Sequence, residues 1–147
     1  MKKLKYLASL ANRALVVWAG ATWVVGYLVA PLLFAHFPRV LAGEAVGVLL
    51  NGVYVLGLCC AVLMLLDMRL RLSKQLHLQR ELWWLIGLVF LLVVQYAGLT
   101  PLMADLKAQS LVNPAMAADF SRWHAVSQVL YLAQSLMLLV LVWRKIR

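Results

Sequence analysis

The chain has 147 residues, of which 65% are apolar and only 13% are charged. Soluble domains carry about 25% charged residues, so this composition leaves too little polar surface for a water-exposed globule and excludes the soluble classes. The net charge of +9 lies on Lys and Arg residues at the borders of apolar segments, without interleaved exposed aromatic residues, which argues against nucleic-acid binding. The sequence therefore predicts one all-α integral membrane domain over residues 1–147, with the lipid bilayer as its main partner.

Continuous apolar runs, without the alternation typical of barrel strands, predict membrane-spanning helices. Each run is about as long as the ~20 residues that a helix needs to cross the hydrocarbon core. Asn113-Pro114 is typical of a helix N-cap followed by proline at the first helical position, which predicts a helical extension over about 114–122. The four predicted spans cover about 14–35, 42–66, 82–104 and 123–143.

Two further segments border these spans. Residues 2–12 carry leucines on one face, which predicts an interfacial helical lead-in. The segment 67–81 mixes leucines with basic residues, so it is expected either to lie on an anionic leaflet or to be a solvated loop.

The distribution of Lys and Arg predicts the orientation. These residues gather before the first span, between the second and third, and after the fourth, whereas the other two bends hold only Arg39, Lys107 and Arg122. Short basic loops stay in the cytoplasm. We therefore expect an antiparallel four-helix bundle in a bacterial-type inner (plasma) membrane, with both termini cytoplasmic.

A proline lies near the outer end of the first span. Because proline lacks an N–H and clashes with the preceding turn, Pro31 is expected to interrupt the helix and free backbone carbonyls. The segment from Tyr27 to Pro31 is similar to the segment from Tyr96 to Pro101, which indicates a weak internal duplication of two hairpins. In that alignment Glu44 corresponds to His124.

Ionisable residues at membrane depth are costly and tend to mark sites. Glu44 opens the second span and His124 opens the fourth, so we predict that they form a paired polar site; an ion pair that only ties the hairpins together is the alternative. His36 is a secondary candidate. Imidazole and carboxylate groups suit divalent metals, which makes His124, Glu44 and His36 candidate metal ligands. His36 and His124 would be the axial pair if haem were bound.

Two polar faces continue from these residues. Glu44, Gly47 and Asn51 share one helical face, and Gly43 with Gly47 allows a close helix contact, either within the chain or between subunits. The fourth span carries a longer face, which Gln95 and Tyr96 are expected to meet from the third. This face either makes interhelical hydrogen bonds or lines a pocket that is open to the outside. Its residues are His124, Ser127, Gln128, Tyr131, Gln134 and Ser135.

Three short motifs carry a family resemblance: Pro31 with Phe34, Ala42 with Gly43, and Phe120, His124 and Ser127 in a Phe-x-x-x-His-x-x-Ser pattern. With them the chain resembles the bacterial domain of unknown function 4149 family, whose relatives include the cisplatin-resistance-associated transmembrane proteins. The resemblance covers the full length and implies a four-helix membrane fold.

A more distant similarity links the chain to the CopD-like group and the HemJ-type protoporphyrinogen oxidases. Leu32 stands where the latter have an arginine, and the first span lacks their histidine haem ligand, which argues against porphyrinogen oxidation.

The leading functional hypothesis is an outward-facing polar pocket that binds or transports a small solute or metal ion. Glu44 and His124 would form its paired site, with Asn51, Ser127, Gln128 and Tyr131 along the path. The alternatives are a haem-binding redox protein of the CopD/HemJ-like type and a scaffold or assembly subunit without cargo. Four helices enclose little room, so a homo-oligomer or a membrane partner is expected. No nucleophile elbow, HExxH or phosphate loop occurs, which argues against a hydrolase.

Overall fold

The computed structural model describes residues 2–72, 79–110, 113 and 115–146, and every regular element in that part of the chain is helical. Two of the elements, η1 and η3, are π-helices. In chain order the elements are α1 (Lys2–Trp23), η1 (Val24–Val29), α2 (Ala30–His36), α3 (Arg39–Leu72), α4 (Arg80–Val93), η3 (Val94–Leu99), α5 (Thr100–Ser110) and α6 (Ala115–Ile146).

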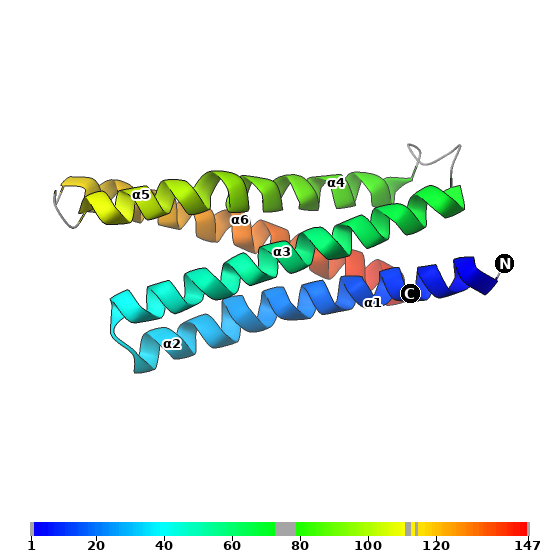
Figure 1. The fold of residues 1–147 in the computed structure, drawn as a ribbon, viewed down its shortest axis with the longest axis horizontal. Helices are drawn as coiled ribbons and strands as arrows, with labels where there is room; N and C mark the ends of the chain where they lie inside the picture. The colour runs from blue at the N-terminus through cyan, green and yellow to red at the C-terminus, as the bar shows by residue number, and fades with distance from the viewer. Residues whose placement is uncertain (1, 73–78, 111–112, 114, 147) are drawn as a thin grey trace.

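The elements form four long rods. The first rod is α1–η1–α2, the second is α3, the third is α4–η3–α5 and the fourth is α6. Each is long and apolar enough to cross a membrane, which confirms the prediction of an all-α chain with four candidate spans. Figure 1 shows the rods side by side, with both ends of the chain at one end of the bundle. We call this the terminal end and the opposite one the far end.

The segments that were predicted as a helical lead-in over 2–12 and as a helical extension, of which residues 115–122 are described, are helical and continue directly into the first rod and α6. The second rod, from Arg39 to Leu72, and the third, from Arg80 to Ser110, extend beyond their predicted spans. Those spans were predicted from apolar residues only, whereas Leu, Met, Lys and Arg all favour helix and long basic side chains reach from a helix end to the headgroups. Pro114 and residues 73–78 lie outside the described residues.

Packing is densest in the terminal half of the bundle. Trp18, Leu88, Leu92 and Leu138 are fully buried there. Gly57 lets α3 pack closely against α1 and α4, because a Cβ at this position would lie 2.6 Å from Trp18 Nε1 and from Leu92 Cδ1. By contrast, η1, α2 and α5, which the structure describes in full, contain no buried residue. The far half is therefore the open half of the molecule.

Charged pairs close the terminal end. Lys145 Nζ on α6 lies 2.6 Å from Glu81 Oε2 on α4. Arg71 pairs with Asp67, whose side chain is only 3% exposed. The prediction from the sequence that Asp67 lies in a loop is wrong, because α3 continues through Leu72 and buries this carboxylate.

Gly43 and Gly47 do not bring helices together within the chain. A Cβ at Gly47 would meet nothing within 4 Å, and one at Gly43 would be 4.0 Å from the Phe34 ring. A contact between subunits through these glycines stays a prediction.

Candidate functional site

The first and third rods contain the same irregularity at the same place. A six-residue π-helix precedes Ala30-Pro31 in one rod and Thr100-Pro101 in the other. Proline supplies no N–H and its ring clashes with the carbonyl four residues earlier, and widening the helix relieves that clash. The N–H of Ala30 accordingly donates to Val25 O, and the N–H of Thr100 to Gln95 O, five residues back. The predicted interruption at Pro31 thus takes the form of a π-helix, an irregularity frequent at functional sites.

The widened turn in the first rod packs against α6. A Cβ added at Gly26 would overlap the ring of Tyr131, so only glycine permits this approach. The Tyr131 hydroxyl donates to the Thr22 carbonyl at 2.6 Å. The Tyr27 ring meets the Tyr131 ring edge to face, with centroids 6.2 Å apart. Tyr131 is therefore fixed against the end of α1 and against η1 by three separate contacts.

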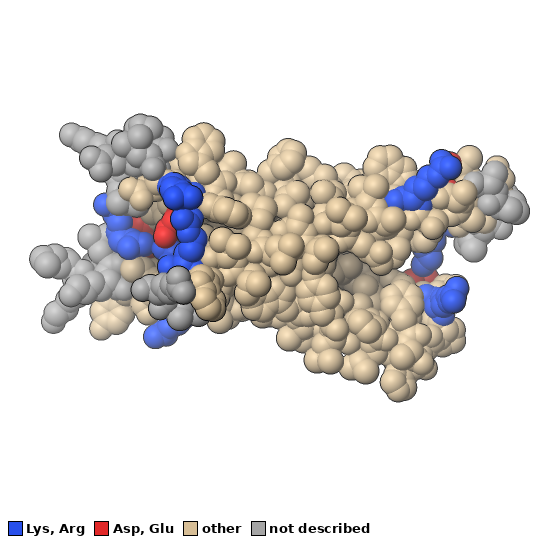
Figure 2. Space-filling model, turned by 180° about the vertical axis from the view of Figure 1, so that it is seen from behind, with Lys and Arg blue, Asp and Glu red and all other residues tan. Residues whose placement is uncertain are grey.

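Above Tyr131, towards the far end, the rods separate around a cavity of about 470 Å³. Its innermost residues are Tyr54 along α3 and Tyr131 and Leu132 along α6. Figure 2, which views the opposite face from Figure 1, shows the surface hollowed in the half away from the termini. The remaining apolar wall residues come from the first rod (Gly26, Tyr27, Ala30, Pro31, Phe34), from α3 (Val46, Leu50), from α5 (Met103) and from α6 (Leu132).

The polar wall comes from α6 alone. His124, Ser127 and Gln128 line the cavity above Tyr131, so four of the six predicted pocket residues lie together. Gln128 Nε2 lies 3.2 Å from His124 Nε2, and the His124 ring stacks on Phe120 with centroids 5.9 Å apart. Apart from the tyrosines, the polar side chains among the described wall residues thus all come from the predicted polar face of α6.

Glu44 and Asn51 lie elsewhere. Glu44 Oε1 is 3.5 Å from Lys107 Nζ on α5, and its side chain is 62% exposed. Asn51 does not line the cavity, and its buried Oδ1 has no hydrogen-bond partner among the described residues. The face of α3 that does line the cavity carries Val46, Leu50 and Tyr54, so the polar stripe predicted on this helix is rotated away from it.

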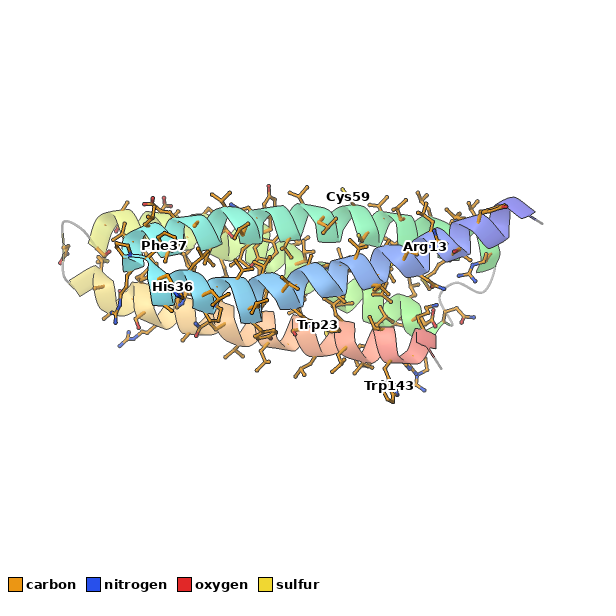
Figure 3. All side chains as sticks on the ribbon, turned by 90° about the horizontal axis from the view of Figure 1, so that it is seen from below. Arg13, Trp23, His36, Phe37, Cys59 and Trp143 are labelled. Atoms are coloured by element: carbon orange, nitrogen blue, oxygen red, sulfur yellow. The ribbon has the colours of Figure 1, made fainter. Side chains whose placement is uncertain are left out.

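The histidines and acidic residues do not gather around one point. Among the described residues there is no group of three or more His, Cys, Asp or Glu side chains that could hold a metal ion. His36 lies at the end of α2, where Figure 3 shows it beside the labelled Phe37, and its Nδ1 is 2.9 Å from its own helix's Leu32 carbonyl. The geometry therefore does not assemble His36, Glu44 and His124 into a ligand set.

The deeper part of the α6 polar face is interhelical hydrogen bonding. Gln95 Nε2 donates to Gln134 Oε1 at 2.7 Å, and both side chains are fully buried. Ser135 is buried as well, and its carbonyl accepts from Trp23 Nε1 at 3.4 Å. The face is therefore divided: residues from His124 to Tyr131 line the cavity, and Gln134 and Ser135 are buried in helix contacts. A pocket open to the outside stays a prediction.

Gly26 and Tyr27 line the cavity but were not predicted from the sequence as pocket residues. The available signal was a glycine one turn before a proline inside an apolar span, where the backbone must both widen and admit a neighbour. Met103 and Leu132 carried no signal, because apolar residues on lipid-facing and cavity-facing sides of a span look alike in sequence.

Comparison with known proteins identifies one family. The model of the family described as "Domain of unknown function (DUF4149)" matches residues 14–112. This segment includes the π-helices and both prolines, whereas Phe120, His124 and Ser127 lie beyond it. No curated protein and no solved structure matches the chain, and the wider resemblances stay predictions. Because the match covers well over half of its residues, the chain belongs to the DUF4149 family.

Proposed function

We propose that this protein is a multi-pass membrane protein that binds a small molecule in the far-end cavity. The cavity opens on the outer side of a bacterial-type inner membrane, and both termini of the antiparallel bundle lie in the cytoplasm. The asymmetry of Lys and Arg between the loops supports this orientation. Figure 2 shows Lys and Arg only towards the two ends of the face it displays, which leaves an apolar band for the bilayer.

The observation that carries the proposal is the contrast between the two halves of the bundle. A scaffold without cargo would be more stable if its far half were packed like the terminal half, where Trp18 and Leu138 are fully buried. Instead the far half is hollowed by an open cavity of about 470 Å³, within the range of roughly 300–1,000 Å³ typical of ligand sites. Apolar walls with a few converging polar groups are also typical of such sites.

The walls favour an organic molecule over a metal ion. His124 is the one His, Cys, Asp or Glu side chain among the described wall residues, and a stable metal site needs several such ligands. We infer binding and not a through-channel, because the filled terminal half and the Glu81–Lys145 pair block the inner end. Movement of the molecule across the membrane would need a rearrangement of the rods, a second copy of the chain or another membrane protein.

The proposal is tested by asking which molecules purify with the protein. Ala30 lines the cavity, and Ala35, on the same short helix, is exposed and does not. We expect Ala30→Trp to fill the cavity and Ala35→Trp to leave it open. Mass spectrometry of solvent extracts should then find at least one small molecule enriched in wild type and in Ala35→Trp and depleted in Ala30→Trp.

Leu132→Trp provides a second, independent block from α6 and guards against a folding defect specific to Ala30→Trp. Size-exclusion elution and helix content by circular dichroism establish that each variant is folded. If folded Ala30→Trp and Leu132→Trp retain the same small molecules as wild type, the cavity is not a binding site and the proposal is wrong.

A further inference from the structure

The cavity also indicates the chemical class of its ligand, an inference that rests on the proposed function. The described wall residues include no Asp, Glu, Lys or Arg. At the rim Gln128 Nε2 lies 3.2 Å from His124 Nε2, within hydrogen-bond distance. The nearby ion pair between Glu44 and Lys107 joins α3 to α5 and does not enter the cavity. The described walls therefore carry no carboxylate, ammonium or guanidinium group.

Polar and apolar groups are separated along the depth of the cavity. His124, Ser127 and Gln128 lie at its far-end rim, whereas the wall below them is Leu50, Leu132 and aromatic rings. The Tyr131 hydroxyl, the polar group at the inner end of the α6 wall, is already occupied by the Thr22 carbonyl. The side chains of His124, Ser127 and Gln128 thus place hydrogen-bonding groups at the rim, and below them the only polar atoms of the described wall side chains are tyrosine hydroxyls.

The cavity is open sideways as well as towards the far end. Tyr27, Phe34 and Leu132 line it and are each 45–50% exposed, and all three lie within candidate membrane spans. The opening between the first and fourth rods therefore faces lipid chains. Along α6 the wall from His124 to Leu132 covers about 12 Å at 1.5 Å per residue, which places its lower part well below the headgroups.

From this arrangement we infer that the ligand is a neutral amphiphile of the outer leaflet, with a hydroxyl or carbonyl head and one apolar chain. Its head would bond to His124, Ser127 and Gln128 at the rim, and its chain would lie over Phe34 and Leu132 towards Tyr54. This orientation, head outward and chain inward, is the one that such a molecule already has in the bilayer. It enters through the lateral opening without leaving the membrane. A charged head would lose hydration at the rim without meeting an opposite charge, which is costly at membrane depth.

Photolabelling with matched probes tests the inference. The probes are a long-chain alcohol with a diazirine in its chain, and the carboxylic acid and trimethylammonium compounds with the same chain, each added at pH 8 to the protein in zwitterionic lipid nanodiscs. We expect the alcohol to label the peptides that contain Phe34 and Leu132. The two charged probes should label them roughly tenfold less, because neither charge finds a partner. Labelling by the alcohol should fall several-fold in Ala30→Trp and stay at the wild-type level in Ala35→Trp.

Equal or stronger labelling of these peptides by a charged probe, sensitive to Ala30→Trp, would overturn the neutral class and leave the proposed function standing. Labelling by the alcohol that is the same in Ala30→Trp and wild type would also overturn the inference, since the probe would then report surrounding lipid only. The proposed function is judged separately by the molecules that purify with the protein.

Discussion

The absence of a side chain at Gly26 lets α6 pack closely against the first rod, and this contact limits the depth of the cavity. The Gly26 backbone lies against the Tyr131 ring, and this approach holds the Tyr131 hydroxyl on the Thr22 carbonyl. Helical spacing in the sequence was enough to predict His124, Ser127, Gln128 and Tyr131 as one polar face. It could not predict the partner of that face, because a glycine in an apolar span leaves no periodic signal of what packs on it.

Replacing Gly26 by alanine is expected to destabilise the fold. The new methyl group would displace the Tyr131 ring and weaken its hydrogen bond to Thr22, at a cost of about 1–3 kcal/mol for overpacking. Gly20→Ala is the matched control, because a Cβ there meets nothing within 4 Å and alanine is the better helix former. Unfolding in detergent micelles should show Gly26→Ala below wild type and Gly20→Ala at or above it. Equal stability of the two variants would mean that the Tyr131 contact does not anchor α6.

At the scale of elements, the hairpin of the first rod with α3 and the hairpin of the third rod with α6 share the same features. Both π-helices end immediately before the residue that precedes a proline. The Tyr27–Tyr131 and Tyr54–Tyr96 pairs share one geometry, with centroids 6.2 Å apart and planes at 66°. In each pair a π-helix of one hairpin meets the long helix of the other. These correspondences support the weak duplication that the sequence indicated around Pro31 and Pro101.

The two hairpins differ where the cavity forms. Glu44 on α3 pairs with Lys107 on α5. In the sequence alignment His124 on α6 corresponds to Glu44. Phe37 follows Pro31 by the same number of residues as Lys107 follows Pro101, so it corresponds to Lys107. His124 and Phe37 do not carry opposite charges. An ion pair therefore joins α3 to α5 on one side of the bundle, and no equivalent ion pair of these counterparts joins the first rod to α6 on the other side. In the sequence alignment Glu44 and His124 are counterparts, and in the structure they do not pair, because Glu44 lies against Lys107 and His124 lines the cavity.

The buried glutamine pair is expected to couple the third and fourth rods. Gln95→Leu and Gln134→Leu each leave one amide without its partner, whereas the double variant removes both. We expect a double-mutant cycle of unfolding free energies to give a coupling of about 0.6–1.7 kcal/mol, the range found for hydrogen bonds between membrane helices. The matched pair Ser127→Leu and Gln95→Leu, whose side chains do not contact each other, should be additive. A coupling of zero between Gln95 and Gln134 would show that the 2.7 Å hydrogen bond contributes nothing to helix association.

At the scale of the whole molecule, the membrane makes the architecture predictable and the site much less so. Apolar runs identify the spans because every backbone polar group inside a bilayer must bond within its own helix. The second and third rods extend further than their predicted spans, and Asp67 was predicted in a loop, because charged residues at the borders of a span can belong to the helix or to the loop. Which half of the bundle is filled depends on contacts such as Gly57 with Trp18, and these are not encoded in hydropathy.

The central claim is that the cavity is open and lies on the outer side of the membrane. Cysteine labelling tests both parts in a background without Cys59 and Cys60. Ser127→Cys lines the cavity near its rim, and Ser135→Cys, two turns deeper on the same helix, is buried between rods. In intact spheroplasts a membrane-impermeant maleimide should label Ser127→Cys and leave Ser135→Cys unlabelled, and adding Ala30→Trp should slow the labelling. Labelling of Ser127→Cys only after permeabilisation, or none at all in folded protein, would contradict the account.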